Sequence, residues 1–312
     1  MPEESPQVSR LLSSAETFAQ SALRARLDGD SMVYLLHAST ALELLAKAYL
    51  ASLSGSLIAA HDFDSLLHGC GHSRHARTHP SRMKTITMSE ALRRVRQVEP
   101  AFKHHEPSLQ LLADVRNGVV HAGFLEPGAD EAGFVPFLRA CDVLLNTIPG
   151  GDRSQMWGEL VSTVDARLSE SAREVELLVT DAIASARLAF EQRYGSMDPA
   201  VREGVLSGIE SSYGVTKYEQ FLVECPACGR QALTSGSHDV DWEADWDFAD
   251  GEAYIAGGYP VVTYLPGYLH CRICELELDG YDQIEAADIP TSWTVEDADP
   301  ADFYEPEDDD WR

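Results

Sequence analysis

The chain has 312 residues and a formal net charge of −27, with 51 acidic against 24 basic side chains. This length allows two domains, or one large domain with a satellite, and an apolar content of 44% argues against a chain that is disordered throughout. No apolar run approaches the ~18 residues that suggest a membrane span. The opening segment MPEESPQVSR lacks the apolar core of a signal peptide. We therefore expect a soluble, cytoplasmic protein with no membrane partner.

The charge is unevenly distributed along the chain. Residues 1–150 carry 14 basic and 16 acidic side chains, a net charge of −2, whereas residues 151–312 carry 10 and 35, a net charge of −25. Residues 237–312 alone hold 22 acidic side chains and only two arginines. The C-terminal half should therefore repel phosphate, while the nearly neutral N-terminal half remains a candidate for contact with nucleic acid.

Apolar spacing predicts helices through the first half of the chain. Residues 7–27 and 31–53 place apolar side chains at i, i+3, i+4 and i+7, and the DGD sequence at 28–30 supplies a break and an N-cap. Gly123 stands where a helix that ends near residue 122 would place a glycine. Further helices are predicted at 89–98, 107–122 and 134–147.

The sequence changes character after residue 147. IPGGD at 148–152 indicates a linker, and residues 156–194 predict one long amphipathic helix, suited to a spacer or a dimerising arm. After a shorter helix at 198–212, runs rich in Tyr, Trp, Gly and Val predict strands from Tyr218 onward. The expected fold is mainly α, organised as a helical domain (1–150), a helical arm (151–215), a small β-rich domain (216–296) and an acidic disordered tail (297–312).

Four of the six cysteines form two C-x-x-C pairs, within FLVECPACGRQALT (221–234) and GYLHCRICELELDG (267–280). Each stretch predicts a strand, a tight turn and a second strand, and two such turns can present four thiolates to Zn²⁺ in a tetrahedron. Four sulfur ligands leave no open position for a catalytic water. The alternative is four unrelated buried cysteines. We expect a zinc ribbon with one structural zinc ion held by Cys225, Cys228, Cys271 and Cys274.

A loop rich in histidine and arginine is predicted at residues 54–86, after the second predicted helix. Its cations predict a surface that contacts the phosphates of RNA, for which Arg74, Arg77 and Lys84 are the candidates. The spacing of its cysteine and histidine residues fits no metal-ligand pattern. Two alternatives remain, a solvated loop without a partner and a second metal site at Cys70, His72 and His75.

The stretch DVRNGVVHAG (114–123) carries Arg116, Asn117 and His121 late in a predicted helix. At 100° per residue, Arg116 and His121 lie about 140° apart and flank an apolar stripe. In a two-fold dimer, a second helix packed across that stripe would bring both residues of both copies into one cleft. An imidazole near a helix C-terminus can transfer protons at neutral pH, and a guanidinium can hold a phosphodiester. Alternatively, Arg116 makes a salt bridge and His121 only decorates the helix end.

RNGVVH resembles the R-x(4–6)-H motif of HEPN domains, in which a polar residue such as Asn117 usually follows the arginine. The resemblance extends over the helical pattern of residues 7–147, including ALELLAKAYL (41–50) with its glutamate. It implies an N-terminal HEPN-like helical bundle and a metal-independent endoribonuclease that works as a homodimer. Such enzymes leave a 2′,3′-cyclic phosphate and a 5′-hydroxyl.

The resemblance also implies roles for individual residues. His121 is the general acid or base, Arg116 stabilises the phosphate, and Asn117 orients the backbone or the substrate. Glu43 is a further candidate, although a buried glutamate that faces Lys47 or Arg116 could equally be structural.

Two hypotheses about function follow. The first is a ribonuclease, a toxin or phage-defence effector, that acts on RNA and has an antitoxin or another protein as partner. Its acidic C-terminal region could bind a basic partner or fold back on the basic loop as an autoinhibitor. The second is a non-catalytic HEPN dimer that serves as an adaptor and presents zinc ribbons and acidic tails to protein partners.

Overall fold

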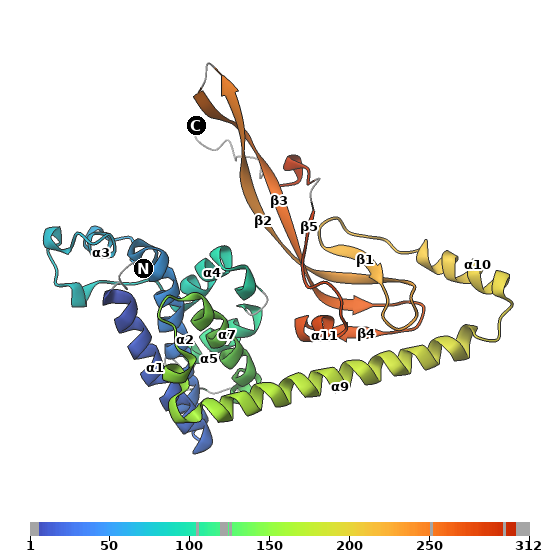
Figure 1. Ribbon diagram of the computed structural model, residues 1–312, viewed down its shortest axis with the longest axis horizontal. Helices are drawn as coiled ribbons and strands as arrows, with labels where there is room; N and C mark the ends of the chain where they lie inside the picture. The colour runs from blue at the N-terminus through green and yellow to red at the C-terminus, as the bar shows by residue number, and fades with distance from the viewer. Residues whose placement is uncertain are drawn as a thin grey trace. The chain divides into compact units, whose positions relative to one another are not determined.

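The computed structural model describes residues 6–103, 106–118, 124, 127–249, 252–295 and 298–303. The chain forms two compact units, Met1–Ser171 (unit 1) and Ala172–Arg312 (unit 2), which are described separately below (Figure 1). Within the described ranges, no helix is long and apolar enough to cross a membrane.

Unit 1 is built around the helix α2 (Ser31–Leu53), which packs against α1 (Pro6–Leu27) over their whole length. Asp30 caps α2, because its side chain accepts a hydrogen bond from the Val33 N–H at 3.0 Å. Residues on every side of α2 are buried, as expected for a helix at the centre of a bundle. Small alanines on the facing sides of α1 and α2 let the two helices approach closely.

Most other helices of unit 1 pack against α2 or α1, and Figure 1 shows them gathered around this pair. The helices predicted at 7–27, 31–53, 89–98 and 134–147 are confirmed to within a residue. The predicted helix 107–122 is described as α5 up to Asn117, and its expected end at Gly123 lies outside the described residues. The covering helices are α4 (Met88–Val98), α5 (Glu106–Asn117), α6 (Ala129–Ala132), α7 (Phe134–Thr147) and α8 (Arg153–Trp157), with the short turns η4 (Pro100–Phe102) and η6 (Gly158–Leu160).

The histidine-rich segment predicted as a loop contains ordered short helices. They are α3 (Phe63–Gly69) and the turns η1 (Gly55–Ile58), η2 (Ser73–His75) and η3 (Pro80–Arg82). An isolated bridge between Ala59 and Thr85 ties the two ends of the segment together. Thr85 and the residues that follow it therefore run beside α2 and lead directly into α4.

The long helix α9 (Val161–Tyr194) crosses the boundary between the units. It begins five residues later than the predicted start at residue 156, because Gly158 adopts a left-handed φ of +54° that ends α8. Its first turns contribute Val164 to the core of unit 1, and its second half contributes Val179 and Ala186 to the core of unit 2. The finer division of the chain into four segments stays a prediction.

Unit 2 contains a small antiparallel sheet in the order β1-β2-β3-β4, with β5 paired to β3. Two strands of 19 residues each form a long hairpin, which stands out in Figure 1. Gly236 lies at a bulge of this hairpin, where a Cβ atom would come within 2.0 Å of the Leu265 carbonyl oxygen. The elements are α10 (Pro199–Glu210), β1 (Gln220–Glu224), β2 (Gln231–Ala249), β3 (Glu252–His270), β4 (Glu277–Asp279), α11 (Tyr281–Ala286), β5 (Trp293–Val295) and η7 (Pro300–Asp302).

The tail predicted to be disordered, residues 297–312, contains the described turn η7, which is tied to the rest of unit 2. Asp302 accepts a hydrogen bond from the Tyr218 hydroxyl at 3.0 Å and pairs with Lys217 at 2.5 Å. Residues 304–312 lie outside the described part of the chain. The helical first unit and the antiparallel second unit agree with the predicted fold of a helical domain followed by a small β-rich region.

Candidate functional site

The four paired cysteines come together in unit 2. Their sulfur atoms all lie within 4.8 Å of one another, with Cys225 and Cys274 at 3.5 Å and Cys228 and Cys271 at 3.6 Å. All four are free thiols. A tetrahedron with metal–sulfur bonds of ~2.3 Å has edges of ~3.8 Å, close to these separations. The cluster is therefore positioned to hold a metal ion, as the spacing of the pairs predicts.

The two C-x-x-C turns share one backbone plan. The residue after each pair has a left-handed φ, +68° for Gly229 and +61° for Glu275. Its N–H donates to the carbonyl of the first cysteine, at 2.9 Å in the first turn and 2.8 Å in the second. The sequence indicates this geometry only at Gly229, because a glutamate in the left-handed region is uncommon.

The thiols of the cluster influence one another strongly. Because they hydrogen-bond among themselves, the pKa of Cys225 and of Cys271 falls below that of an ordinary cysteine. The same bonds raise the pKa of Cys228 and of Cys274. A bound metal would hold all four groups as thiolates and release their protons. Four sulfur ligands at tetrahedral spacing suit Zn²⁺.

Two arginines of α9 bind the backbone of the cysteine turns. Arg187 donates to the carbonyl oxygen of Pro226 at 2.9 Å, inside the first turn. Arg193 donates to the carbonyl oxygen of Ile273 at 3.4 Å, inside the second turn. Both turns are therefore docked on one helix, and two guanidinium groups lie near a cluster that becomes anionic when it binds metal.

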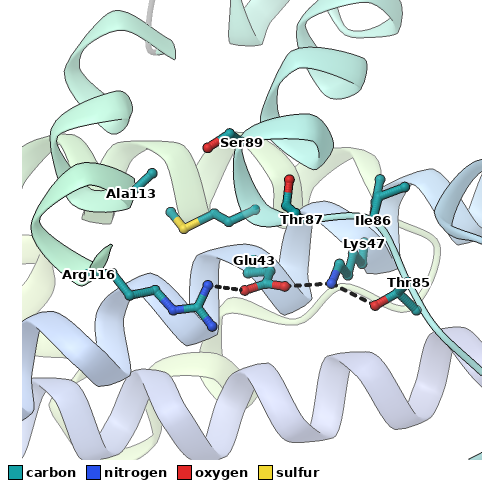
Figure 2. A pocket seen from close by; sticks show the side chains of 9 residues that line it. Glu43, Lys47, Thr85, Ile86, Thr87, Ser89, Ala113 and Arg116 are labelled. Atoms are coloured by element: carbon teal, nitrogen blue, oxygen red, sulfur yellow. Dashed lines mark hydrogen bonds and ion pairs between the residues drawn. The ribbon is translucent and has the colours of Figure 1, made fainter. Parts of the chain in front are cut away.

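A second site is a pocket of about 440 Å³ in unit 1. It is formed by one face of α2, the end of α5, the start of α4 and the strand-like segment before α4 (Figure 2). Most of its polar side chains are cations or hydroxyls. The pocket is lined by Glu43, Lys47, Thr85, Ile86, Thr87, Met88, Ser89, Ala113 and Arg116.

Glu43 connects the two cations of this pocket. One carboxylate oxygen accepts from Arg116 Nη1 at 2.7 Å, and the other accepts from Lys47 Nζ at 2.5 Å. Lys47 Nζ also donates to Thr85 Oγ1 at 2.9 Å. Figure 2 shows Arg116 and Lys47 reaching Glu43 from opposite sides. The side chain of Lys47 is 7% exposed and that of Glu43 14%, whereas that of Arg116 is 34% exposed and can reach a ligand.

The local sequence explains how these groups meet. Glu43 and Lys47 are four residues apart on α2 and so lie on one face of the helix. Thr87 caps α4, its hydroxyl accepting from the Glu90 N–H at 3.3 Å, so the positive end of that helix dipole faces the pocket. The lining carries two cations and one carboxylate, a formal charge of +1 in a chain of −27.

The structure places only part of the predicted catalytic motif in this pocket. Arg116 lies in the pocket and pairs with Glu43, which also faces Lys47. Asn117 is the last residue of α5, and His121 lies outside the described residues. The sequence did not indicate that Thr85, Thr87 and Ser89 line the same pocket. The four-residue spacing of Glu43 and Lys47 was the one available signal for the carboxylate–cation pair.

The candidate phosphate-contacting residues Arg74, Arg77 and Lys84 are all exposed. In the part of the chain that the structure describes, the four cysteines above are the one group whose ligand atoms are close enough to hold a metal. The structure does not bring Cys70, His72 and His75 together as such a group, and a second metal site there stays an untested alternative.

Comparisons with known proteins add no relative. No family model matches the chain, and neither the curated proteins nor the solved structures contain a match to it.

Proposed function

We propose that this protein is a HEPN-type, metal-independent endoribonuclease that acts as a homodimer in the cytoplasm. The observation that carries the proposal is the placement of Arg116, fixed by Glu43 beside the buried Lys47, in a positively charged pocket. A guanidinium binds phosphate oxygens through its forked N–H donors. A phosphodiester therefore matches this pocket in both charge and hydrogen bonding.

The reaction would be an internal transesterification of RNA. A ribose 2′-hydroxyl loses its proton to a base and attacks the adjacent phosphorus, forming a new oxygen–phosphorus bond. The bond to the 5′-oxygen breaks, and that oxygen takes a proton from an acid. The products are a 2′,3′-cyclic phosphate and a 5′-hydroxyl, with no net consumption of water.

In this scheme Arg116 stabilises the extra negative charge on the phosphorane oxygens. His121 transfers protons, and a homodimer supplies two such histidines, one for the base and one for the acid. Asn117 orients the backbone or the substrate. Glu43 is a positioning residue, because it fixes the guanidinium of Arg116 through Nη1 at 2.7 Å and leaves the side chain one-third exposed.

Two features of the described pocket support a mechanism without a metal. Its lining offers one carboxylate, Glu43, and both oxygens of that group already bind cations. Hard cations such as Mg²⁺ need several oxygen ligands, so this donor set suits an anion and not a metal. For the cysteine cluster we propose one zinc ion with a structural role, which stabilises unit 2 and takes no part in cleavage.

A toxin or phage-defence effector is the biological role that we propose for such an enzyme. RNA is its substrate, and an antitoxin or another protein partner restrains it. A nuclease that attacks cellular RNA needs such restraint.

The proposal is tested with purified protein and total RNA in EDTA. We expect the wild type to cleave and to leave 2′,3′-cyclic phosphate ends, and Arg116→Ala and His121→Ala to be inactive. Arg93→Ala is the matched control, since Arg93 is an exposed arginine that pairs with Glu90 outside the pocket lining. Intact RNA with every variant would refute the nuclease, and equal cleavage by all variants would refute the residue assignment. Light scattering should give the mass of two chains.

A non-catalytic adaptor is the second candidate, and one observation favours it. The hairpin of β2 and β3 exposes the large aromatic side chains Trp242 and Tyr259, and exposed aromatics often anchor protein partners. The Arg116–Glu43 pair would then be structural. An absence of cleavage together with a dimeric mass would support this adaptor.

A further inference from the structure

Residues 61–79 of unit 1 form a small module, here called the α3 knob, which lies at one edge of that unit (Figure 1). Its centre is His68, a buried histidine. One ring nitrogen of His68 bonds Ser73 Oγ at 3.0 Å and the other lies 3.3 Å from Thr78 Oγ1. The ring thus joins α3 to the turns that follow it. The knob is a fixed platform, and this histidine serves its structure.

The acidic side chains of the knob are occupied by its own backbone. Asp62 caps α3, accepting from the Ser65 N–H at 3.0 Å and from the Ser65 hydroxyl at 2.9 Å. Asp64 accepts from the Arg77 N–H at 3.2 Å. These carboxylates shape the knob, and no described ion pair joins them to its arginines.

The cations of the knob are available to a ligand. Within the described residues, neither Arg74 nor Arg77 makes an ion pair with a carboxylate; Arg74 donates instead to the ring of His75 at 3.0 Å. Arg93 and Arg94, by contrast, both pair with Glu90 on the neighbouring helix α4. In a chain with twice as many acids as bases, such exposed, unneutralised guanidinium groups match an anionic partner.

The same module carries an exposed aromatic ring. Phe63 is 75% exposed, more than any other large apolar side chain in the described part of the protein. It is the first residue of α3, directly after the capping Asp62. Because its side chain is mostly exposed there, the packing of the knob does not require an aromatic residue at this position. Leu66, one turn along the same helix, is also exposed. An exposed aromatic ring on the same module as arginines without a carboxylate partner is typical of surfaces that bind single-stranded nucleic acid.

We propose that the α3 knob binds the nucleotides that flank the cleavage site of a single-stranded RNA. The ring of Phe63 stacks on one base, and Arg74 and Arg77 bind neighbouring phosphates. Paired bases are already stacked and cannot lie on a protein ring without unpairing, so the site selects single-stranded RNA. This inference rests on the proposed function and names the form of its substrate.

A short segment of the chain connects the knob to the pocket. Thr85 of the pocket wall lies seven positions after Thr78 of the knob, so the Cα atoms of these two residues are at most ~25 Å apart. The backbone of this segment is fixed where it meets the pocket, because the Ala60 N–H donates to the Lys84 carbonyl at 2.9 Å. Lys84 adds an exposed cation on the way. One RNA strand of several nucleotides can therefore reach both sites.

Cleavage kinetics test the inference against its own controls. The substrates are a pool of dinucleotides, which fill only the pocket, and a single-stranded RNA of about 12 nucleotides, within the usual range of site sizes. We expect Phe63→Ala to raise KM about tenfold for the longer RNA and to leave kcat and dinucleotide cleavage unchanged. Phe63→Trp should keep the wild-type KM. Leu27→Ala, which also removes an exposed apolar side chain, should change nothing.

Two results would overturn the inference while the proposed function survives. One is an unchanged KM of Phe63→Ala for the longer RNA, and the other is an equal loss with both substrates. If the wild type cleaves nothing, the proposed function fails. The inference is then tested separately, by measuring the binding of the same 12-nucleotide RNA through fluorescence anisotropy. Binding must then weaken in Phe63→Ala and Arg77→Ala.

Vesicles of phosphatidylcholine and phosphatidylserine form a further arm of the experiment. Binding to these vesicles that depends on Phe63, without binding to RNA, would overturn the inference and assign the knob to membranes.

Discussion

Arg116 and Glu43 are joined by an ion pair of 2.7 Å although 73 residues separate them in the sequence. The pair links α5 to α2, and through the second oxygen of Glu43 it also reaches Lys47. One carboxylate therefore holds a partly exposed guanidinium and a buried ammonium in place at once. Both the stability of unit 1 and the charge of its pocket depend on this group.

We expect Glu43→Gln to lower the free energy of unfolding by about 3 kcal/mol, because it leaves the buried Lys47 without its counter-charge. If the pocket cleaves RNA, Glu43→Gln should also reduce kcat/KM for cleavage by about tenfold to a hundredfold, because Arg116 is then held less firmly. Urea unfolding and RNA cleavage measure the two effects. Glu90→Gln is the control, since this more exposed pair should contribute about 1 kcal/mol or less. Equal losses in the two variants would show that Glu43 is an ordinary surface acid.

Much of this arrangement can be predicted from local sequence, but the pocket itself cannot. The helical period predicts α1, α2 and α7 closely, and the two C-x-x-C pairs predict the cysteine cluster, because both signals depend on spacing within a short stretch. Thr85, which accepts from Lys47, and Thr87 join the pocket lining only through the tertiary packing of α4 on α2. No local pattern indicates that contact.

Two differences from the sequence-based prediction have identifiable local causes. The long helix starts at Val161 because Gly158 breaks the chain with a positive φ. The segment around α3 is ordered because the buried His68 bridges two hydroxyls, whereas a run of histidines by composition alone predicts a basic, solvated loop.

The start of α4, which forms one wall of the pocket, should carry a pH dependence. Hydrogen bonds from Arg93 and Arg94 lower the pKa of Glu90 from an ordinary 4.5 to about 2. Because the folded pKa is the lower one, Glu90 contributes stability that is fully present above about pH 4.5 and is lost as the pH falls toward 2. We expect the free energy of unfolding of Glu90→Gln to fall less steeply than that of wild type in this range. Acid titration followed by circular dichroism measures the slopes, and parallel curves would contradict this assignment.

The cysteine cluster should hold one metal ion per chain. We expect elemental analysis to find zinc in the wild type and none in Cys271→Ser, because one lost thiolate opens the tetrahedron. Unit 2 should then lose much of its structure, since the buried thiols form part of its core and metal binding contributes directly to folding. Tryptophan fluorescence follows that loss. Cys70→Ser is the control, as Cys70 is exposed in unit 1. Wild-type protein that is folded and free of metal would contradict the prediction.

Arg187 should strengthen metal binding although it is not a ligand. Its guanidinium donates to the carbonyl oxygens of Pro226 at 2.9 Å and of Ala227 at 3.3 Å, the two residues between the first pair of cysteines. These bonds fix the turn in its ligating form and place a positive charge near an anionic cluster. Residues that hold metal ligands in place by hydrogen bonds, without touching the metal, commonly change metal affinity by about tenfold to a hundredfold.

We therefore expect Arg187→Ala to weaken zinc binding by about tenfold in competition with a chromophoric chelator. Arg187→Lys keeps the positive charge but loses the forked N–H donors of the guanidinium. If the charge matters, this variant should bind zinc more tightly than Arg187→Ala. If the two backbone hydrogen bonds account for the effect, the two variants should bind zinc equally. Arg173→Ala removes an exposed arginine from the same helix and should bind zinc as the wild type does. Equal affinities for Arg187→Ala and Arg173→Ala would mean that α9 only supports the ribbon by packing, through Val179 and Ala186.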